Sequence, residues 1–256
     1  MEYKKGYVCF IDILGFSSFV KSSENIKKTY DLFEFIKKLC FLFNASKELN
    51  TEITFYSDSI VITTSDISWL LPVIYISESY LQDNLGLLFR GGVCYGDYHH
   101  EKGMTFGPGV IKAYELEKQA ICSRIIIDKE LTVDLDDKGY YVDFDGFVCL
   151  NPYGMILEEI LSFGDEVHYP QGDLNTILLE KFNEHKCEIL NNIKKYRGTA
   201  VVEKYLWRIR PFNHICNKIA NISFDDYIYE DIQFKNNQIL KDGILKMVIR
   251  EEDLNC

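Results

Sequence analysis

Hydrophobic residues follow two different periods along the first part of the chain. A continuous apolar run over residues 7–11 is typical of a strand that is covered on both faces. Apolar residues then recur at intervals of three or four over residues 24–47, which predicts an amphipathic helix. Two short runs rich in β-branched and aromatic residues, 53–56 and 60–63, flank Ser57-Asp58-Ser59 and predict a tight hairpin.

The same two periods repeat once more before the pattern changes. A helical spacing of apolar residues covers residues 70–81, and a strand-like run covers residues 87–95. The predicted order is therefore β-α-β-β-α-β, which is the split βαβ arrangement. Because crossover connections are right-handed, both helices should cover one face of the sheet. The pattern thus predicts an α+β fold, a ferredoxin-like core with an antiparallel sheet.

The rest of the chain falls into two parts that meet at Asn151 and Pro152, because the pattern of apolar and polar residues differs before and after them. Before that point the pattern predicts a loop over residues 103–109, a helix over 110–119, a strand over 124–128 and one or two strands within 140–150. After it, two helices are predicted over residues 173–196 and 200–220. We therefore expect a core domain over residues 1–150 and a mainly helical C-terminal extension over residues 151–256.

The composition narrows the possible classes of function. The 256 residues carry a net charge of −11, so the general surface repels the phosphate backbone of a nucleic acid. The sequence holds no apolar run long enough to predict a membrane span. None of the eight cysteines forms a Cys-x-x-Cys pair, and most have apolar neighbours, which is typical of buried reduced thiols. With no signal-peptide pattern in the first residues, these features predict a cytoplasmic protein.

Asp12 and Asp58 are the residues most informative about chemistry. Asp12 ends the first predicted strand, and Asp58 lies on the turn of the predicted hairpin. Because strand one lies beside strand three in a split βαβ sheet, both carboxylates should reach one edge. Two neighbouring carboxylates repel each other when ionised, which favours a divalent cation between them. Mg²⁺ prefers such oxygen ligands and completes its shell with phosphate oxygens. Either aspartate alone is also compatible with a turn-capping role.

Four motifs place these two aspartates in a wider context. The first two, separated by 46 residues between their aspartates, are Phe10-Ile11-Asp12-Ile13-Leu14-Gly15-Phe16-Ser17 and Phe55-Tyr56-Ser57-Asp58-Ser59-Ile60. The other two are Phe89-Arg90-Gly91-Gly92-Val93-Cys94-Tyr95-Gly96 and Gly107-Pro108-Gly109-Val110-Ile111-Lys112-Ala113-Tyr114-Glu115-Leu116-Glu117. In order, they resemble the two metal motifs, the fourth core strand and the following helix of class III nucleotidyl cyclases. The resemblance covers about residues 6–150, with Ser57 where glycine is usual.

The resemblance implies a two-metal mechanism in which the ribose 3′ oxygen attacks the α-phosphorus in line. It implies that Asp12 and Asp58 hold two Mg²⁺ or Mn²⁺ ions, with the carbonyl oxygen of Ile13 as a further ligand. The β- and γ-phosphates would face the backbone of Leu14, Gly15, Phe16 and Ser17. The active form would be a homodimer with composite sites, each reached by the helix near residues 110–116 of the other copy.

The departures from the family pattern concern the substrate. The positions of the family's transition-state Asn and Arg correspond to Ile111 and Glu115. The positions that read a purine base correspond to Thr54 and Met104, neither of which makes the hydrogen bonds expected for adenine or guanine. Two interpretations follow. The chain is either a silent cyclase used as a regulatory module, or an enzyme for another base with other phosphate ligands.

One branch of the family offers a closer comparison. The segments Ala113-Tyr114-Glu115-Leu116-Glu117 and Ser123-Arg124-Ile125-Ile126-Ile127-Asp128 are similar to the Pycsar pyrimidine cyclases of bacterial antiphage defence, which carry a C-terminal helical extension. This branch implies a second-messenger synthase that makes cyclic UMP or cyclic CMP. The ring NH and two carbonyls of uracil suit a Thr54 hydroxyl that both donates and accepts, which favours UTP. Further substrate ligands would come from Tyr114, Glu115, Arg90 and Arg124.

Several alternatives stay open at this stage. A cytidylate cyclase, a purine nucleotide cyclase, a silent nucleotide-binding module and an unrelated ferredoxin-like domain all fit parts of the pattern. Arg90 and Arg124 are each also compatible with a structural charge. The cluster His99-His100-Glu101 is interpreted as a solvated loop, because adjacent histidines in an extended stretch point to opposite sides and no third ligand is evident.

Overall fold

The computed structural model describes residues 2–22, 26–45, 51–101, 103–134, 139–154, 174–199, 201–221 and 237–255. The chain forms two compact units. The first consists of Met1–Asp136 and Val142–Leu150, and the second of Asp137–Tyr141 and Asn151–Cys256. The candidate chemistry lies entirely in the first unit.

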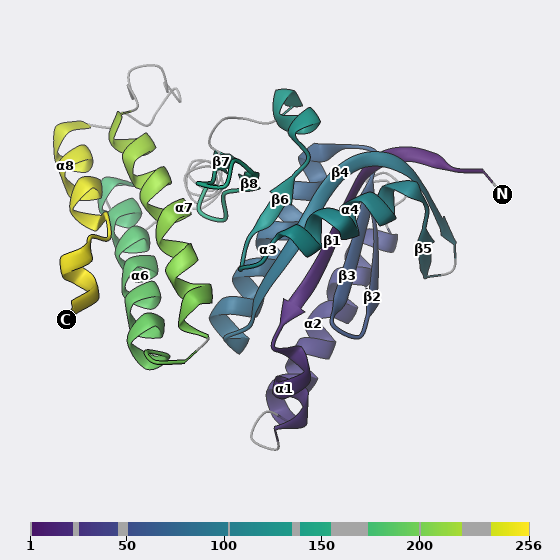
Figure 1. Cartoon of the computed structure of the whole chain (residues 1–256), viewed down its shortest axis with the longest axis horizontal. Coiled ribbons are helices and arrows are strands. Elements are labelled where there is room, and N and C mark those ends of the chain that lie inside the picture. Colours follow the sequence, from purple (N-terminus) through teal and green to yellow (C-terminus); the bar gives the residue numbers. More distant parts are fainter. Residues whose placement is uncertain are drawn as a thin grey trace. The chain divides into compact units, whose positions relative to one another are not determined.

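An eight-stranded sheet forms the centre of the first unit (Figure 1). Its order is β2-β3-β1-β4-β6-β8-β7, with β5 paired to β4 outside this path. The strands are β1 (Lys4–Leu14), β2 (Thr51–Tyr56), β3 (Ser59–Thr64), β4 (Leu88–Glu101), β5 (Met104–Phe106), β6 (Ile125–Ile127), β7 (Tyr140–Val142) and β8 (Val148–Leu150). The first four strands pair antiparallel with β1 between β3 and β4, as the split βαβ pattern predicts.

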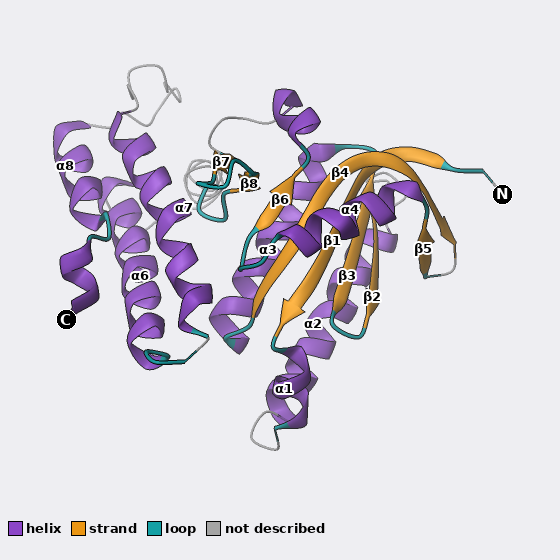
Figure 2. Ribbon diagram, in the orientation of Figure 1, coloured by secondary structure: helices purple, strands orange, loops and turns teal. Residues whose placement is uncertain are grey.

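Helices cover both faces of this sheet (Figure 2). In Figure 1, α2 and α3 lie behind the strands and α4 crosses in front of them. The helical elements of the first unit are α1 (Phe16–Lys21), α2 (Ile26–Ala45), α3 (Ile67–Leu85), α4 (Pro108–Gln119) and the short 3₁₀ helix η2 (Lys129–Asp134). The predicted α+β fold with a βαββαβ core is therefore confirmed.

Outside this antiparallel core, α4 is a crossover helix and returns β6 parallel to β4. Two local expectations were wrong. β1 does not end at Asp12, because Ile13 and Leu14 continue its pairing with β4. The segment 103–109, predicted as a loop, contains β5, which folds back on the end of β4.

The core of the first unit explains the continuous apolar run in β1. Val8, Cys9 and Ile11 are all fully buried, because helices pack on both faces of this central strand. On α2 the buried residues Leu32, Ile36 and Leu39 share one helix face.

All seven cysteines in the described part of the chain are free, and five of them are buried: Cys9, Cys94, Cys122, Cys149 and Cys216.

The second unit is mainly helical. It contains α6 (Leu174–Lys195), α7 (Val202–Asn221), α8 (Asn237–Met247) and the short 3₁₀ helix η4 (Glu251–Asn255). The two long helices agree with the predicted ranges, and their facing aromatic rings Phe182 and Phe212 are fully buried. Across the described residues, no helix combines the length and the apolar character that a membrane crossing requires.

Candidate active site

The ends of β1 and of the β2–β3 hairpin bring Asp12 and Asp58 to neighbouring positions. In the β1–β3 register Asp12 lies opposite Ser59, and Ser59 directly follows Asp58 in the sequence. The backbone N–H of Ile13 also donates a hydrogen bond of 2.8 Å to the carbonyl oxygen of Asp58. Two candidate ligands that are 46 residues apart in the sequence are therefore held together by main-chain hydrogen bonds.

The turn that carries Asp58 is as short as a hairpin allows. Tyr56 and Ser59 are paired, so only Ser57 and Asp58 form the loop. Ser57 has φ 57° and is the one described residue other than glycine with a positive φ. A positive φ at the first loop residue is typical of a type II′ turn, for which glycine is the preferred residue. Ser57 occupies the position where the resembling family usually carries glycine, so the backbone keeps a conformation that the side chain disfavours.

Arg90 on β4 links Asp12 to a second carboxylate that sequence reasoning did not single out. Its Nε lies 3.2 Å from Asp12 Oδ2 and 2.6 Å from Glu117 Oε1. The Glu117 side chain is only 3% exposed, whereas those of Arg90 and Asp12 are 30% and 23% exposed. Burial raises the pKa of the Glu117 carboxyl, and the nearby Arg90 cation opposes that rise.

Gly92 explains why Glu117 can reach Arg90 from a helix. A Cβ at Gly92 would collide with the carbonyl oxygen of Ala113 and lie 2.8 Å from the backbone nitrogen of Glu117. α4 therefore lies directly on β4, with no side chain between the two backbones at this point. The Gly91-Gly92 pair carried this signal, but the sequence did not show which residue of α4 used the space.

The donor atoms at this edge fit a divalent metal ion that shares its shell with a substrate. Asp12 and Asp58 supply two carboxylates, and the Ile13 carbonyl is a third oxygen within the same stretch of backbone. Within the described residues no three or more His, Cys, Asp or Glu side chains gather into a metal site. Mg²⁺ commonly takes one or two protein carboxylates and obtains its other ligands from phosphate and water. The residues present suit that kind of site.

The segment from Leu14 to Ser17 makes the strand-to-helix turn that follows. Gly15 is left-handed with φ 80°, and its carbonyl oxygen accepts a hydrogen bond of 3.0 Å from the N–H of Phe19. α1 begins directly after it at Phe16. The hydrophobic pattern did not predict α1, because six residues are too few to establish a helical period.

Thr54 contacts the β4–β5 hairpin. Its Oγ1 lies 2.7 Å from Oγ1 of Thr105, which in turn lies 2.7 Å from Nδ1 of His100. Met104 is 62% exposed. β5 pairs with β4 in a register that places His100 opposite Thr105 and Met104 opposite Glu101.

His100 is part of a folded cluster and not of the solvated loop that we expected. It lies in β4 with its side chain only 9% exposed, 3.4 Å from the carboxylate of Glu52. Burial lowers the pKa of His100, and Glu52 opposes that shift. A hydroxyl–imidazole–carboxylate cluster therefore joins β2 to the β4–β5 hairpin.

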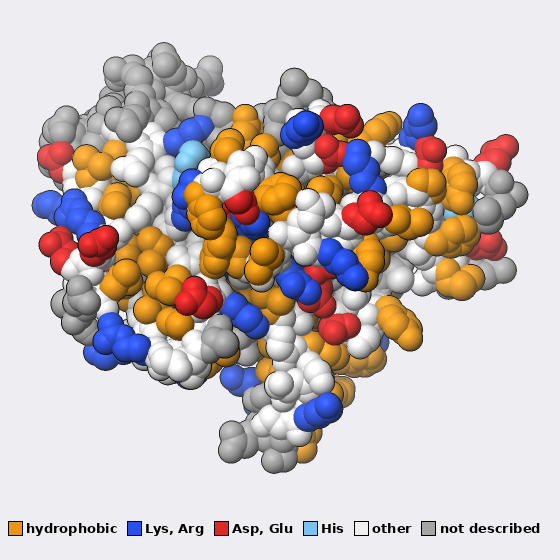
Figure 3. Space-filling model, viewed as in Figure 1, with side chains coloured by type: hydrophobic (Ala, Val, Ile, Leu, Met, Phe, Trp, Pro, Cys, Tyr) orange, Lys and Arg blue, Asp and Glu red, His pale blue; other side chains and the backbone are white. Residues whose placement is uncertain are grey.

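The outer face of α4 carries the residues at the family's Asn and Arg positions. Ile111 and Glu115 are both exposed, as is Tyr114 between them. Tyr114 packs edge-on against Phe10 with ring centroids 5.2 Å apart, and Lys118 Nζ lies 4.7 Å from its ring centroid. Figure 3 shows hydrophobic side chains mixed with charged ones over the face that α4 crosses.

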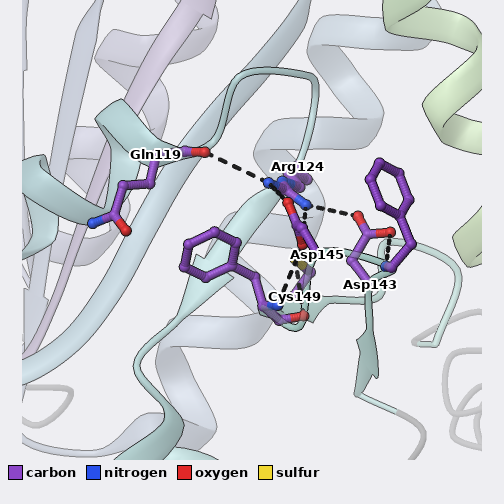
Figure 4. Close-up of polar contacts among 7 residues, drawn as sticks. Gln119, Arg124, Asp143, Asp145 and Cys149 are labelled. Carbon is purple, nitrogen blue, oxygen red and sulfur yellow. Dashed lines mark hydrogen bonds and ion pairs between the residues drawn. The ribbon is translucent and has the colours of Figure 1, made fainter.

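The Arg124 side chain is buried in ion pairs and is not an accessible cation (Figure 4). Its guanidinium, 2% exposed, binds Asp143 at 2.8 Å and Asp145 at 2.5 Å. It also donates to the carbonyl oxygen of Gln119. We therefore leave Arg124 out of the proposed substrate site. Sequence reasoning could not see this arrangement, because Asp143 and Asp145 follow β7 and reach Arg124 only through the sheet order.

Comparisons with known proteins add similarities of low identity. No protein-family model matches the chain. A curated relative is the DNA-directed RNA polymerase subunit beta of Eimeria tenella, 24% identical over 262 residues. The alignment covers all of this chain but only 23% of that subunit's length.

Solved structures similar to this chain include several nucleotide cyclases. The adenylate/guanylate cyclase/hydrolase from Silicibacter pomeroyi is 16% identical, with 59% of this chain and 96% of that chain covered and a TM-score of 0.41. The guanylyl cyclase Cya2 is 18% identical, with 58% and 91% covered and a TM-score of 0.36. The guanylyl cyclase domain of RhoGC from Blastocladiella emersonii is 17% identical, with 58% and 96% covered and a TM-score of 0.40. Because these similarities are low, an activity has to be argued from the residues of this chain.

Proposed function

We propose that the protein is a nucleotide cyclase that converts UTP to 3′,5′-cyclic UMP and pyrophosphate. The observation that carries the proposal is the neighbouring position of Asp12 and Asp58 on a βαββαβ sheet. The motifs around both residues resemble the metal motifs of class III cyclases. In the reaction a bond forms between the ribose 3′ oxygen and the α-phosphorus. The bond from the α-phosphorus to the bridging oxygen breaks, the hydroxyl proton passes to solvent and pyrophosphate leaves.

Asp12, Asp58 and the carbonyl of Ile13 would hold two Mg²⁺ or Mn²⁺ ions. When bound, such ions activate the attacking hydroxyl and neutralise the charge on the leaving pyrophosphate. The residues of the chain orient the nucleotide. Backbone amides in the turn from Leu14 to Ser17, where Gly15 is left-handed, would contact the β- and γ-phosphates.

We further propose that the active form is a homodimer with composite sites. The exposed face of α4 supports this proposal, because Ile111, Tyr114 and Glu115 point away from the core of their own unit. In a two-fold dimer, α4 of each copy would reach the nucleotide bound by the other copy, which makes two equal sites. Tyr114 would then stack on the base, and Glu115 would approach the ribose.

The preference for uracil rests on Thr54 and its neighbours. Thr54, Thr105 and His100 form a chain of hydrogen-bonding groups whose direction depends on the imidazole tautomer. In one direction the Thr54 hydroxyl keeps lone pairs for the uracil N–H, and in the other it keeps a proton for a uracil carbonyl. A role as second-messenger synthase in antiphage defence follows only from the resemblance to the Pycsar branch and stays a prediction.

A second candidate function has one observation in its favour. Arg90 pairs with Oδ2 of Asp12, so a cation of the chain itself already contacts one oxygen of a candidate metal ligand, which would suit a silent module that binds a nucleotide or a partner. Retention of both aspartates is the argument against this silent module.

Competition among substrates tests the proposal. ATP, GTP, CTP and UTP are supplied at equal concentration with Mn²⁺, and the cyclic products are counted by mass spectrometry. We expect cyclic UMP to dominate. A dominant cyclic CMP peak would change only the base, and a dominant cyclic AMP or cyclic GMP peak would refute the pyrimidine preference. No cyclic product from any of the four would favour the silent module.

A further inference from the structure

We propose that Glu117 is a positioning residue that takes Arg90 from Asp12 when a metal ion binds. The inference rests on the proposed function, because it assumes that Asp12 is a metal ligand. Its subject is different, however. It concerns how a chain whose Asp12 is already paired with an arginine can make that carboxylate available.

The geometry shows a guanidinium shared between two carboxylates. Arg90 Nε is closer to Glu117 Oε1, at 2.6 Å, than to Asp12 Oδ2, at 3.2 Å. The partner at the shorter distance is also the more buried, since Glu117 is 3% exposed and Asp12 23%. The Nε–H of Arg90 donates its hydrogen bond to Asp12 Oδ2, whereas the buried Glu117 Oε1 is an ion-pair partner that accepts no hydrogen bond from the described residues. Glu117 therefore has an acceptor position open for Arg90 on the side away from the candidate metal position.

Glu117 is held in this place by the backbone and not by a flexible side chain alone. The contact of α4 with β4 at Gly92 fixes the backbone nitrogen of Glu117 directly over the sheet. Arg90 and Asp12 occupy opposite positions in the β1–β4 register, so the distance between their backbones is also fixed. The three side chains thus have rigid attachments on three separate elements.

The role of Glu117 follows from the charges of the side chains around Asp12. A divalent ion that binds Asp12 through Oδ2 competes with Arg90 for the oxygen that accepts its hydrogen bond, and the two neighbouring cations repel each other. With Glu117 present, the displaced cation keeps an anionic partner in a partly buried site. Without it, the cation would be stranded, and breaking such a pair is strongly unfavourable. Arg90 would then stay on Asp12 and compete with the metal.

The test is a double-mutant cycle on metal binding. Mn²⁺ alone is titrated into the full chain, and the signal of free Mn²⁺ is followed by electron paramagnetic resonance. Glu117→Gln should weaken Mn²⁺ binding about tenfold, the scale of changes in residues that support metal ligands. Arg90→Gln/Glu117→Gln should restore binding to within about twofold of wild type, because the competing cation is gone.

Two results would overturn the inference. Unchanged Mn²⁺ affinity in Glu117→Gln would show that Arg90 leaves Asp12 without help. Equally weak binding in Glu117→Gln and in the double variant would show that Glu117 attracts the metal by its charge alone, with no transfer of Arg90. Should circular dichroism show Glu117→Gln to be unfolded, Glu117→Asp replaces it, since its carboxylate is withdrawn from Arg90. The same direction is expected for Mn²⁺ affinity.

Asp12→Asn separates failure of this inference from failure of the proposed function. If Asp12→Asn binds Mn²⁺ like wild type, the assignment of Asp12 as a metal ligand is wrong and the proposed function falls with it. If Asp12→Asn loses Mn²⁺ binding while Glu117→Gln keeps it, only the positioning role of Glu117 is wrong.

Discussion

The N–H of Ile13 donates a hydrogen bond of 2.8 Å to the carbonyl oxygen of Asp58. This one contact ties the end of β1 to the turn of the β2–β3 hairpin. It lies beside the β1–β3 pairing of Asp12 with Ser59, so the two aspartates are fixed relative to each other by main-chain atoms. Their side chains can therefore be exchanged with little effect on the backbone that carries them.

Activity should depend on both aspartates while the fold does not. Asp12→Asn and Asp58→Asn should each abolish cyclic nucleotide formation, because each removes a carboxylate ligand of the proposed metal ions. The circular dichroism spectra should stay unchanged. Glu34→Gln is the matched control, since Glu34 is a half-buried carboxylate on α2 whose ion pair is with the exposed Lys37. Near-normal turnover of either Asn variant would refute the metal assignment.

The hairpin turn should tolerate glycine and reject a β-branched residue at Ser57. Ser57 has φ 57°, where a β-branched side chain is strained. Ser57→Val should lower the free energy of unfolding by about 1–2 kcal/mol. Ser57→Gly should hold it at least at the wild-type value, and urea titrations of the purified variants measure both. Ser59→Val, in the adjacent strand β3, is the control and should not destabilise the protein. Equal effects of the two valines would argue against the positive φ.

Complementation between two inactive chains should reveal composite sites. Asp12→Asn leaves α4 intact, and Tyr114→Ala leaves the metal edge intact. If the proposed dimer forms at random from a mixture, half of the dimers are mixed and each has one complete site, so about a quarter of wild-type activity should return. The measurement is turnover of the co-expressed pair against each variant alone. Full wild-type activity in a monomer of 29.9 kDa, seen by light scattering, would contradict the dimer.

The stability of the first unit should fall in acid through Asp145. Hydrogen bonding from Arg124 lowers the pKa of this carboxyl. A lowered pKa in the folded state means that the unfolded state binds more protons in acid. The stabilisation is therefore complete above the unfolded pKa of about 4 and is lost as the pH falls further. Urea titrations between neutral pH and pH 3 should show a shallower loss for Asp145→Asn than for wild type.

The control for that experiment is Glu180→Gln, an exposed position on α6. Its pH profile should match wild type. Arg124→Gln should destabilise the protein by about 3 kcal/mol at neutral pH, because it leaves the buried carboxylate of Asp143 without its cation. The folded fraction of Arg124→Gln should keep its activity. A specific loss of activity without loss of stability would return Arg124 to the substrate site.

Much of the fold could be predicted from the sequence because it rests on local periodicity. The alternation of strand and helix patterns determined the βαββαβ order, and the order placed Asp12 and Asp58 at one edge. What escaped prediction depends on register between distant segments. Glu117 reaches Arg90 only because Gly92 lets α4 lie on β4. Thr105 lies beside Thr54 only because β5 pairs with β4 in one particular register.

The most direct measurement of the central claim is the stoichiometry of products from purified protein. UTP is incubated with Mn²⁺, and both cyclic UMP and pyrophosphate are quantified for wild type and for Asp58→Asn. The proposed reaction predicts one pyrophosphate for each cyclic UMP, and neither product from Asp58→Asn. Release of UDP and phosphate, or equal product formation by the Asp58→Asn variant, would contradict it.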